Sequence, residues 1–531
     1  MNTNTDFGET DPIAPRGDEV VSPPSWIGGV VGLSSGIFAV STGLVVSALG
    51  DSQSSFDLVG GSFIDRTPRW LKELAIQAFG TNDKIALEVG MVGALIIASG
   101  VLGLLSRKRL TPLQFGIVGF GILGALSAFE RDGAGFIAVI APLCGIVAGL
   151  FAAHRLHNYL TTQRELSRMP QQSRVPLGWD RRSFIRTVGA MGALSGGGVL
   201  FARSRELARV QQIEGLTKIP LPPLAVGDEL VVPKINFHPT DPYITPNTSF
   251  YRIDTALSFP RVDREKWKLR IHGLVEREKF FSMDDLLALP QVERIITLCC
   301  VSNQVGGPLI GNAVWRGVLL KDVLESCGIK KNAQQVFSTS LDGWTSGFPI
   351  TAAMDGRDAL IAIGMNGESL PIMHGYPARL VVPGLYGYVS ATKWLSEINI
   401  TTWAEEEGYW IPRGWSRDAP VKTQSRIDVP RQGESIAAGK FRLAGVAWAQ
   451  HTGIEKVEIR IDRGAWQACD LGVDLTDDAW RQWIFDWDAT EGEHTIQVRS
   501  TDKSGYTQTE EVRRVDPDGA TGWHTRTVNV I

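Results

Sequence analysis

Two adjacent cysteines end a β-like run in the segment 295–307, which reads IITLCCVSNQVGG. A polar, glycine-containing loop begins directly after Cys300. A thiol at a strand end beside such a loop can reach a metal or cofactor that stays outside the hydrophobic core. A single cysteine in this position is more often a small buried apolar residue, so the segment alone does not establish a function.

A second segment, residues 370–395, places basic side chains among glycine turns. It reads LPIMHGYPARLVVPGLYGYVSATKWL and contains His374, Arg379 and Lys393. Backbone amides in short glycine turns can approach an anion, and basic side chains add charge-assisted hydrogen bonds. The segment can therefore hold a phosphate and a polar heterocycle. The alternative is a turn-rich surface with unrelated charges.

Composition excludes several classes of protein. The chain has 531 residues, a net charge of −4 and five cysteines. Its length predicts several domains, and its charge gives no reason to expect a nucleic-acid partner. The cysteines form no CxxC or CxxCH pair, which argues against zinc ribbons and covalently attached haem, and their sparse, odd number argues against a disulfide scaffold.

The first third of the chain is expected to lie in a membrane. Residues 1–24 are polar and are interpreted as a cytoplasmic tail, not a removable signal. Residues 25–153 contain four apolar stretches, each long enough to cross about 30 Å of hydrocarbon. Each could be a buried helix of a soluble protein, but four in succession favour a transmembrane bundle. Their approximate limits are Trp26–Val46, Val89–Leu105, Leu110–Phe129 and Gly133–Ala153.

Basic residues in the loops orient this bundle. Arg107, Lys108 and Arg109 follow the second stretch, and residues 154–186 form an arginine-rich loop. Both loops are expected on the cytoplasmic side, together with the N-terminus. A weakly apolar stretch, residues 187–203, is expected to form a fifth transmembrane helix. Everything after it would then lie outside the cytoplasm.

The segment Arg181–Arg186 reads RRSFIR and resembles a twin-arginine export signal. Such a signal suits a domain that folds around a cofactor before it crosses the membrane. The alternative is that the two arginines are positive charges beside a membrane helix.

The last 330 residues or so have a globular composition. Residues 204–244 are expected to form a linker and residues 245–415 a mixed α/β domain. In this domain β-like runs occur at Phe250–Ile253, Trp267–Ile271 and Glu293–Cys299. Helices are expected at Ser282–Leu287, with Ser282 as the N-cap, and at Leu319–Ser326. After Trp415, alternating runs typical of a β-sandwich occur at Phe441–Trp448, Lys456–Asp462, His494–Arg499 and Arg526–Val530.

The motifs CVSN and HGYPARLVVPG…KW, with FYRIDT upstream, resemble those of the sulfite oxidase family of molybdopterin enzymes. They occur in the family's order and spacing, and the resemblance runs from about Thr245 to the C-terminus. It implies an α+β molybdopterin-binding oxidoreductase domain at residues 245–415 and an immunoglobulin-like domain of the dimerisation type at residues 416–531, compatible with a homodimer. The preceding helices resemble a bacterial membrane-anchored branch of the family.

The resemblance implies a molybdenum–molybdopterin cofactor with Cys300 as the catalytic metal ligand. A thiolate suits this metal, and the dithiolene of the cofactor would supply further sulfur ligands. Cys299 would be the adjacent non-ligand. The cofactor-binding residues that the resemblance implies are Phe250, Asn303, Asp342, His374, Arg379, Thr392 and Lys393.

Three departures from the sulfite-oxidising members concern the substrate. Their active-site tyrosine corresponds to Ile363 here, in IGMNG. Their arginines after the ligand cysteine and in the upstream aromatic motif are missing, and Arg252 and Arg316 are only loose substitutes. A small dianion requires convergent positive charge, so the resemblance does not extend to sulfite as the substrate.

We therefore expect a multi-pass protein of the cell membrane, in contact with lipid, whose extracytoplasmic domain performs two-electron oxygen-atom transfer on a small molecule. Its electron-transfer partner is not identifiable from the sequence. One alternative is a redox conduit of the haem-b or quinol type, but His154 and His157 lie in a basic loop and do not support haem. Another is a non-catalytic binding or assembly protein with a degenerate cofactor site.

Overall fold

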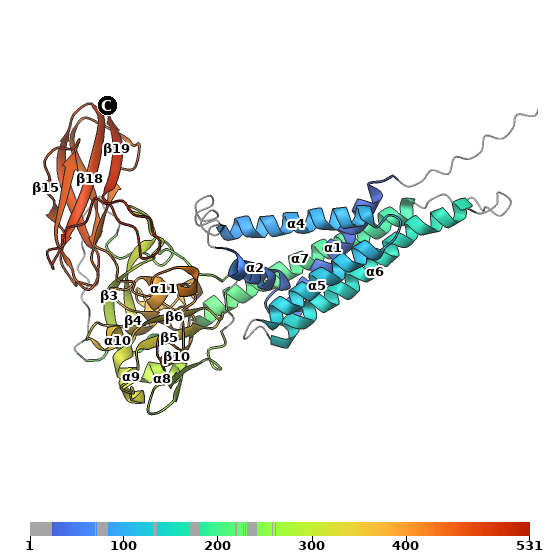
Figure 1. The fold of residues 1–531 in the computed structure, drawn as a ribbon, viewed down its shortest axis with the longest axis horizontal. Helices are drawn as coiled ribbons and strands as arrows, with labels where there is room; N and C mark the ends of the chain where they lie inside the picture. Colours follow the sequence, from blue (N-terminus) through green and yellow to red (C-terminus); the bar gives the residue numbers. More distant parts are fainter. Residues whose placement is uncertain are drawn as a thin grey trace, which may run out of the picture. The chain divides into compact units, whose positions relative to one another are not determined.

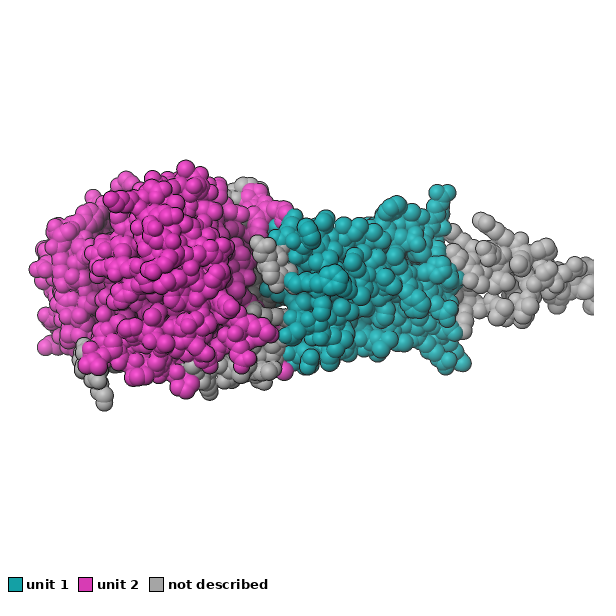
Figure 2. Space-filling view, turned by 90° about the horizontal axis from the view of Figure 1, so that it is seen from below, with its two compact units in different colours: residues 1–63, 74–130, 134–205 teal, residues 64–73, 131–133, 206–531 magenta. Residues whose placement is uncertain are grey.

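The computed structural model describes residues 24–68, 71, 83–130, 135–168, 181–217, 220–226, 228, 230, 242–256, 259–260 and 262–531. The chain divides into two compact units (Figures 1 and 2). One comprises residues 1–63, 74–130 and 134–205, and the other residues 64–73, 131–133 and 206–531. The expected cytoplasmic tail, most of the basic loop after residue 168 and much of the expected linker lie outside the described residues.

The N-terminal unit is helical. Five of its described helices are long and apolar enough to cross a membrane, and each overlaps one of the five stretches expected from hydropathy. Many of their apolar side chains are exposed, including Phe129 and Phe136 at 82% and 78%. The helices that begin in this part of the chain are α1 (Ile27–Leu49), α2 (Ser55–Arg66), α4 (Asp83–Leu105), α5 (Thr111–Phe129), α6 (Gly135–Arg168) and α7 (Arg181–Thr217).

Three helices differ from the sequence expectation. Helix α2 lies between the first two apolar stretches, where the sequence predicts no membrane-spanning helix. Helices α6 and α7 continue past the ends of their apolar stretches, so the first part of the expected linker at residues 204–244 is helical. Hydropathy marks the length that can cross a lipid bilayer, whereas a helix continues wherever strong helix formers such as those of RELARVQQIE follow without proline.

The second unit begins with an α+β part that contains two sheets (Figure 1). The first has the strand order β2-β1-β10-β5-β6, and the second has the order β3-β4-β7-β8 with β9 paired to β7. Their strands are β1 (Lys268–Gly273), β2 (Lys279–Ser282), β3 (Val292–Cys299), β4 (Ile310–Leu319), β5 (Gln335–Ser340), β6 (Thr345–Pro349), β7 (Leu360–Met365), β8 (Glu368–Ser369), β9 (Arg379–Val381) and β10 (Leu395–Thr401). The helices are α8 (Met283–Ala288), α9 (Leu320–Cys327), α10 (Ile350–Met354) and α11 (Gly387–Ser390), with short 3-10 turns η3 (Ile372–His374) and η4 (Ile411–Arg413).

Most of the expected elements of this part are confirmed. Strands β1 and β3 and helices α8 and α9 lie where the sequence predicts them, and Ser282 forms a capping box with Asp285. The strand expected at Phe250–Ile253 is wrong. The backbone N–H of Phe250 donates to the Pro246 carbonyl oxygen (2.9 Å) in a turn, so it cannot join a sheet ladder.

Two further sheets follow residue 415. Their orders are β11-β13-β17-β16 and β12-β19-β18-β14-β15, and they enclose a common core that includes Leu443, Val457 and Trp483. All four strands expected here are present. The strands are β11 (Gln424–Val429), β12 (Ser435–Ile436), β13 (Gly439–Trp448), β14 (Ile454–Ile461), β15 (Gln467–Ala468), β16 (Asp470–Leu471), β17 (Arg481–Ala489), β18 (Gly492–Asp502) and β19 (His524–Val530).

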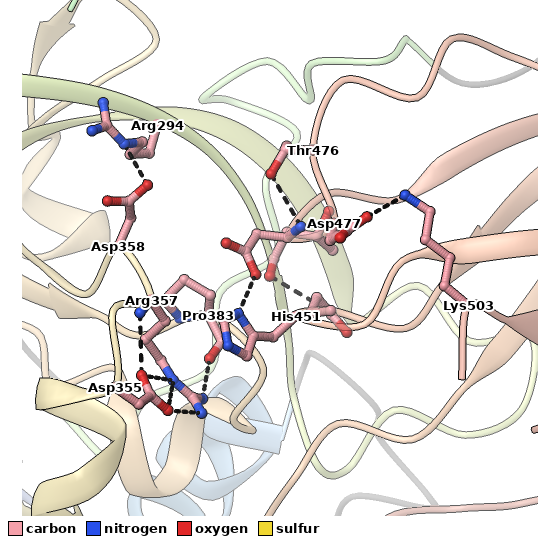
Figure 3. Close-up of polar contacts among 12 residues, drawn as sticks. Arg294, Asp355, Arg357, Asp358, Pro383, His451, Thr476, Asp477 and Lys503 are labelled. Atoms are coloured by element: carbon pink, nitrogen blue, oxygen red, sulfur yellow. Dashed lines mark hydrogen bonds and ion pairs between the residues drawn. The ribbon is translucent and has the colours of Figure 1, made fainter.

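The C-terminal part contacts the α+β part of the same unit, and Figure 3 shows polar side chains of both parts, each paired within its own part. His451 Nδ1 lies 3.2 Å from Asp478 Oδ1, and the Cβ of His451 lies 3.0 Å from the position a Cβ would take on Gly384. Strand β3 takes part directly, because Thr297 Oγ1 accepts the backbone N–H of Trp480 (2.8 Å) and its own N–H donates to the Asp478 carbonyl (2.9 Å). The C-terminal part therefore fixes strand β3, which leads to the cysteines, through these two hydrogen bonds of Thr297.

Glycines allow helices α1 and α4 of the first unit to pack closely. A Cβ added to Gly32 of α1 would overlap the Ser99 carbonyl oxygen of α4, and one added to Gly103 would overlap the Gly28 carbonyl oxygen. Gly28 and Gly32 are four residues apart and so share a helix face. Such small-residue spacing lets two backbones approach within a membrane.

Replacing Gly32 with leucine should therefore force α1 and α4 apart. Overpacking of this kind costs about 1–3 kcal/mol, so the melting temperature of the detergent-solubilised protein should fall. Gly90→Leu is the matched control, because a Cβ there meets nothing within 4 Å. Equal melting temperatures for the two variants would contradict this packing.

Candidate functional site

Cys300 lies directly after strand β3, at the start of the loop that the sequence singled out. Its backbone N–H donates to the Leu309 carbonyl (3.0 Å), and its carbonyl accepts the N–H of Asn303 (3.0 Å). The Asn303 side chain closes the loop, because its Oδ1 accepts the N–H of Leu309 (2.8 Å). The other side-chain atom, Nδ2, is buried without a hydrogen-bond partner in the described part of the chain. The loop thus offers a thiol and a free amide donor.

The two cysteines have different surroundings. Cys299 belongs to a hydrophobic cluster with Tyr386 and Val389. This burial raises the pKa of the Cys299 thiol. Burial also raises the pKa of Cys300, although hydrogen bonds with Ser302 oppose the shift. A thiol of this kind becomes a thiolate only when a strong positive charge such as a metal ion compensates the lost proton.

Arg379 is a buried cation. It lies in β9, is 5% exposed, and its guanidinium lies 4.9 Å above the Trp315 ring. Its Nη1 donates to the His374 carbonyl (2.9 Å), and no described carboxylate binds it. Burial lowers the pKa of Arg379 to about 10, so the side chain stays charged at neutral pH. A buried charge without a counter-ion is costly, so this position favours an anionic ligand.

Lys393 belongs to a second charged group beside it. Its Nζ lies 2.6 Å from Asp254 Oδ2, which also accepts Arg252 Nε at 2.8 Å. Burial lowers the pKa of Lys393 to about 8, although Asp254 opposes the shift. The Arg252 guanidinium stacks 4.3 Å from the Phe259 ring. Two cations thus share one carboxylate.

His374 packs against Phe250 near the charged side chains of Arg379, Lys393 and Arg252. The His374 ring is 5.6 Å from the Phe250 ring, and its Nε2 is 2.7 Å from the Asn247 carbonyl oxygen. Burial, followed by the charges of Arg379, Lys393 and Arg252, lowers the pKa of His374 to about 4. The ring is therefore neutral at pH 7. Because a carbonyl can only accept, Nε2 carries the proton and Nδ1 is left as an acceptor.

The structure brings Phe250, His374, Arg379 and Lys393 together. Tyr251 stacks on Phe250, with ring centroids 5.2 Å apart, and burial raises the pKa of its hydroxyl. Two expected residues point elsewhere. The Thr392 hydroxyl bonds Ser338 (2.7 Å) and Ser346 (2.8 Å), in strands β5 and β6. Asp342 stabilises its own turn by accepting the N–H of Trp344 (3.2 Å), and no contact joins it to the other expected residues in the described structure.

Sequence reasoning missed two residues of this site, Tyr251 and Asp254. Both lie within FYRIDT, so the motif itself was the available signal. Of the two loose substitutes for the missing arginines, Arg316 forms an ion pair with Glu293 (3.0 Å) and Arg252 one with Asp254. Ile363 lies 3% exposed in the main hydrophobic cluster.

Comparison with known proteins relates this chain to molybdopterin-dependent oxidoreductases. A family model described as an oxidoreductase molybdopterin binding domain matches residues 256–410. Human mitochondrial sulfite oxidase is 29% identical over 291 residues, which cover 46% of this chain and 53% of that protein. Sulfite oxidase of Arabidopsis thaliana is 30% identical over 271 residues, covering 42% of this chain and 68% of the relative. An uncharacterized oxidoreductase of Bacillus subtilis, YuiH, is 35% identical over 153 residues, covering 29% and 74%. The chain thus spans about half the length of the human protein.

The neutral state of His374 predicts a pH dependence of stability. Its pKa of about 4 in the folded protein is below the value of 6.5 expected after unfolding, so the unfolded chain binds this proton first as the pH falls. Stability should decrease between about pH 6.5 and pH 4, by about 3 kcal/mol at most from this group. His374→Gln should show a smaller loss of melting temperature between pH 7 and pH 4.5. His494→Gln, at a histidine whose pKa is raised by Asp462, should not reduce that loss.

Proposed function

Because the chain belongs to the sulfite oxidase family of molybdopterin-dependent oxidoreductases, we propose that it is a membrane-anchored molybdenum enzyme. In this proposal Cys300 binds the metal, and the enzyme carries out two-electron oxygen-atom transfer on a small substrate outside the cytoplasm. The C-terminal sheets correspond to the family's immunoglobulin-like dimerisation domain, so a homodimer is the expected assembly.

The observation that carries the proposal is the buried charge of Arg379. Together with Lys393, Arg252 and Asp254 it forms a group of three cations and one carboxylate. The surplus of roughly two positive charges matches a phosphate monoester, which carries about −1.5 to −2 at pH 7. A pterin cofactor ending in a phosphate fits this group.

The remaining side chains also suit such a cofactor. The free Nδ2 of Asn303 is a donor, and Nδ1 of the neutral His374 is an acceptor, as a polar heterocycle requires. The described residues contain no group of three or more His, Cys, Asp or Glu able to hold a metal ion, so a metal at Cys300 needs most of its ligands from the cofactor. The bound cofactor would supply the two-electron redox chemistry, and the protein its binding and orientation.

The described charges near the site do not favour sulfite as the substrate. Arg252 and Arg316 are each paired with a carboxylate, and Ile363 packs in the core, so they do not supply the convergent charge that sulfite needs. An optical assay that follows the oxidised and reduced protein with sulfite, S-oxides and N-oxides separates an oxidase from a reductase.

The anchoring part of the proposal rests on the five apolar helices and on loop charge. Cytoplasmic Arg107 and Lys108 and the basic loop before α7 would leave the second unit outside the cytoplasm. His154 and His157 both lie on α6, whereas paired haem ligation needs facing helices, so anchoring is the role we assign to this bundle.

Molybdenum binding through Cys300 has a direct consequence for the holoprotein. The purified protein should contain stoichiometric molybdenum and show a thiolate-to-metal charge-transfer absorption. Cys300→Ser should abolish that absorption and lower turnover at least about 100-fold, as removal of a group essential in the transition state does. Cys299→Ser changes the cysteine that packs in the hydrophobic cluster, so this variant should keep the charge-transfer absorption and the turnover of the wild type. Wild-type protein made with cofactor available but free of molybdenum would rule out the proposal.

Export of a folded domain is tested by the paired arginines. In a bacterial host with twin-arginine export, Arg181→Lys with Arg182→Lys should leave the second unit inside the cytoplasm. Protease added to spheroplasts would then cleave it in the wild type but not in the variant. The control variant, Arg203→Lys with Arg205→Lys, makes the same charge-preserving change outside the motif. Its second unit should be exported as in the wild type. Export of both variants would instead support simple positive-inside charge.

A further inference from the structure

A tight turn between β7 and β8 contains the asparagine and glycine of the MNG motif. Met365 pairs with Glu368 across this turn, and Asn366 and Gly367 both have positive φ, at +54° and +83°. Asparagine followed by glycine is the pair that two-residue hairpin turns of this kind favour. The turn alone explains an asparagine here, but it requires only the backbone conformation of that residue.

The side chain of Asn366 joins two other segments of the same unit. On one side its Oδ1 accepts the N–H of Val314 in β4 (2.9 Å), and the backbone N–H of Asn366 donates to the Val314 carbonyl (2.7 Å). On the other side its Nδ2 donates to the Thr245 carbonyl (2.9 Å) and to Asn247 Oδ1 (2.8 Å). The amide oxygen and both amide N–H groups therefore have partners, and together they tie residues 245–247 to β4.

The segment that Asn366 holds carries the hydrogen-bond partner of His374. The Asn247 carbonyl oxygen lies 2.7 Å from His374 Nε2. The same segment leads to Phe250, whose ring meets the His374 ring edge-on at 5.6 Å. Asn247 also donates its side-chain N–H to Glu368 Oε1 (2.5 Å), so the turn between β7 and β8 contacts this segment through two residues. A displacement of the segment would move both the carbonyl and the ring that fix His374.

His374 depends on this support because its ring is neutral and has two possible tautomers. Burial lowers the pKa of His374 to about 4. In a neutral imidazole, the hydrogen bond that one nitrogen makes decides which nitrogen carries the proton. The Asn247 carbonyl can only accept, so it keeps the proton on Nε2 and leaves Nδ1 as an acceptor.

We infer that Asn366 is a positioning residue for the cofactor, because through Asn247 it fixes the orientation and the tautomer in which His374 meets the pterin. The inference rests on the proposed function, which assigns His374 to the cofactor. A His374 ring with its proton on Nδ1 would offer a donor where the wild type offers an acceptor, and one hydrogen bond to the pterin would be lost. The asparagine of the MNG motif thus serves the site as well as the turn.

The test measures the His374 ring in the full-length protein reconstituted in lipid. Solid-state nuclear magnetic resonance of isotope-labelled histidine shows which ring nitrogen carries the proton, and the signals missing in His374→Gln identify this ring. Asn366→Gly keeps a residue that readily adopts positive φ but removes the side-chain amide. It should convert the Nε2-protonated ring into a mixture of tautomers. Molybdenum should dissociate from this holoprotein about tenfold faster than from the wild type, as expected for the loss of one hydrogen bond.

Two further variants separate positioning from folding. Asn332→Gly is the matched control, because Asn332 is an exposed residue in the turn before β5, and it should leave the His374 ring and the rate of molybdenum loss unchanged. Asn247→Ala keeps the backbone carbonyl that His374 uses but removes the side chain that Asn366 holds. It should change the tautomer and the rate of molybdenum loss in the same direction as Asn366→Gly, and it replaces that variant where Asn366→Gly does not fold.

The outcomes distinguish this inference from the proposed function. An Nε2-protonated His374 ring and an unchanged rate of molybdenum loss in Asn366→Gly and Asn247→Ala would overturn the inference, even if the melting temperatures fell, since the contacts would then serve the fold alone. A changed tautomer without faster molybdenum loss would also overturn it, because the cofactor would not depend on that tautomer. Wild-type protein without molybdenum would overturn the proposed function itself.

Discussion

The candidate site depends on a guanidinium held in the protein interior without a described carboxylate partner. Arg379 is fixed by strand β9, which pairs with β7, and by the carbonyl of His374. Gly375 makes this possible: its φ is +116°, and a Cβ there would lie 3.0 Å from the Arg379 Cβ and 3.2 Å from the Lys393 Cα. Only glycine readily adopts this conformation, so the HGYPAR segment can bring histidine, arginine and lysine around one turn.

The cysteine loop is held by a comparable set of contacts, and several come from the C-terminal sheets. Arg426 Nη1 donates to the Gly307 carbonyl (3.1 Å), and a Cβ on Gly306 would overlap the His524 ring. His524 is itself fixed, because its Nδ1 accepts the N–H of Ile427 (2.8 Å). Burial and two nearby arginines lower the pKa of His524 to about 3, so the ring stays neutral and can keep accepting. The C-terminal sheets therefore shape the segment that presents Cys300.

Local patterns predicted the elements of the molecule better than the contacts of the site. Alternation and capping located β3, α8 and the strands after residue 415, because these signals lie within a few neighbouring residues. The turn at Pro246 overrode the β-like pattern of Phe250–Ile253, and α2 has too little apolar character to be found by hydropathy. The pairing of Lys393 with Asp254 joins residues 139 positions apart, and no local pattern could have found it. The same limit applies to Thr392, whose hydroxyl bonds that of Ser338, 54 positions away, whereas Asp342 accepts the N–H of Trp344 within its own turn.

The central claim is that Cys300 supplies a sulfur ligand to molybdenum beside the phosphate held by Arg379. X-ray absorption at the molybdenum edge of the purified protein measures this most directly, since it counts the sulfur atoms bound to the metal. The account predicts sulfur from the cofactor's dithiolene plus one thiolate, and one sulfur fewer in Cys300→Ser but not in Cys299→Ser. An unchanged sulfur count in Cys300→Ser would contradict it.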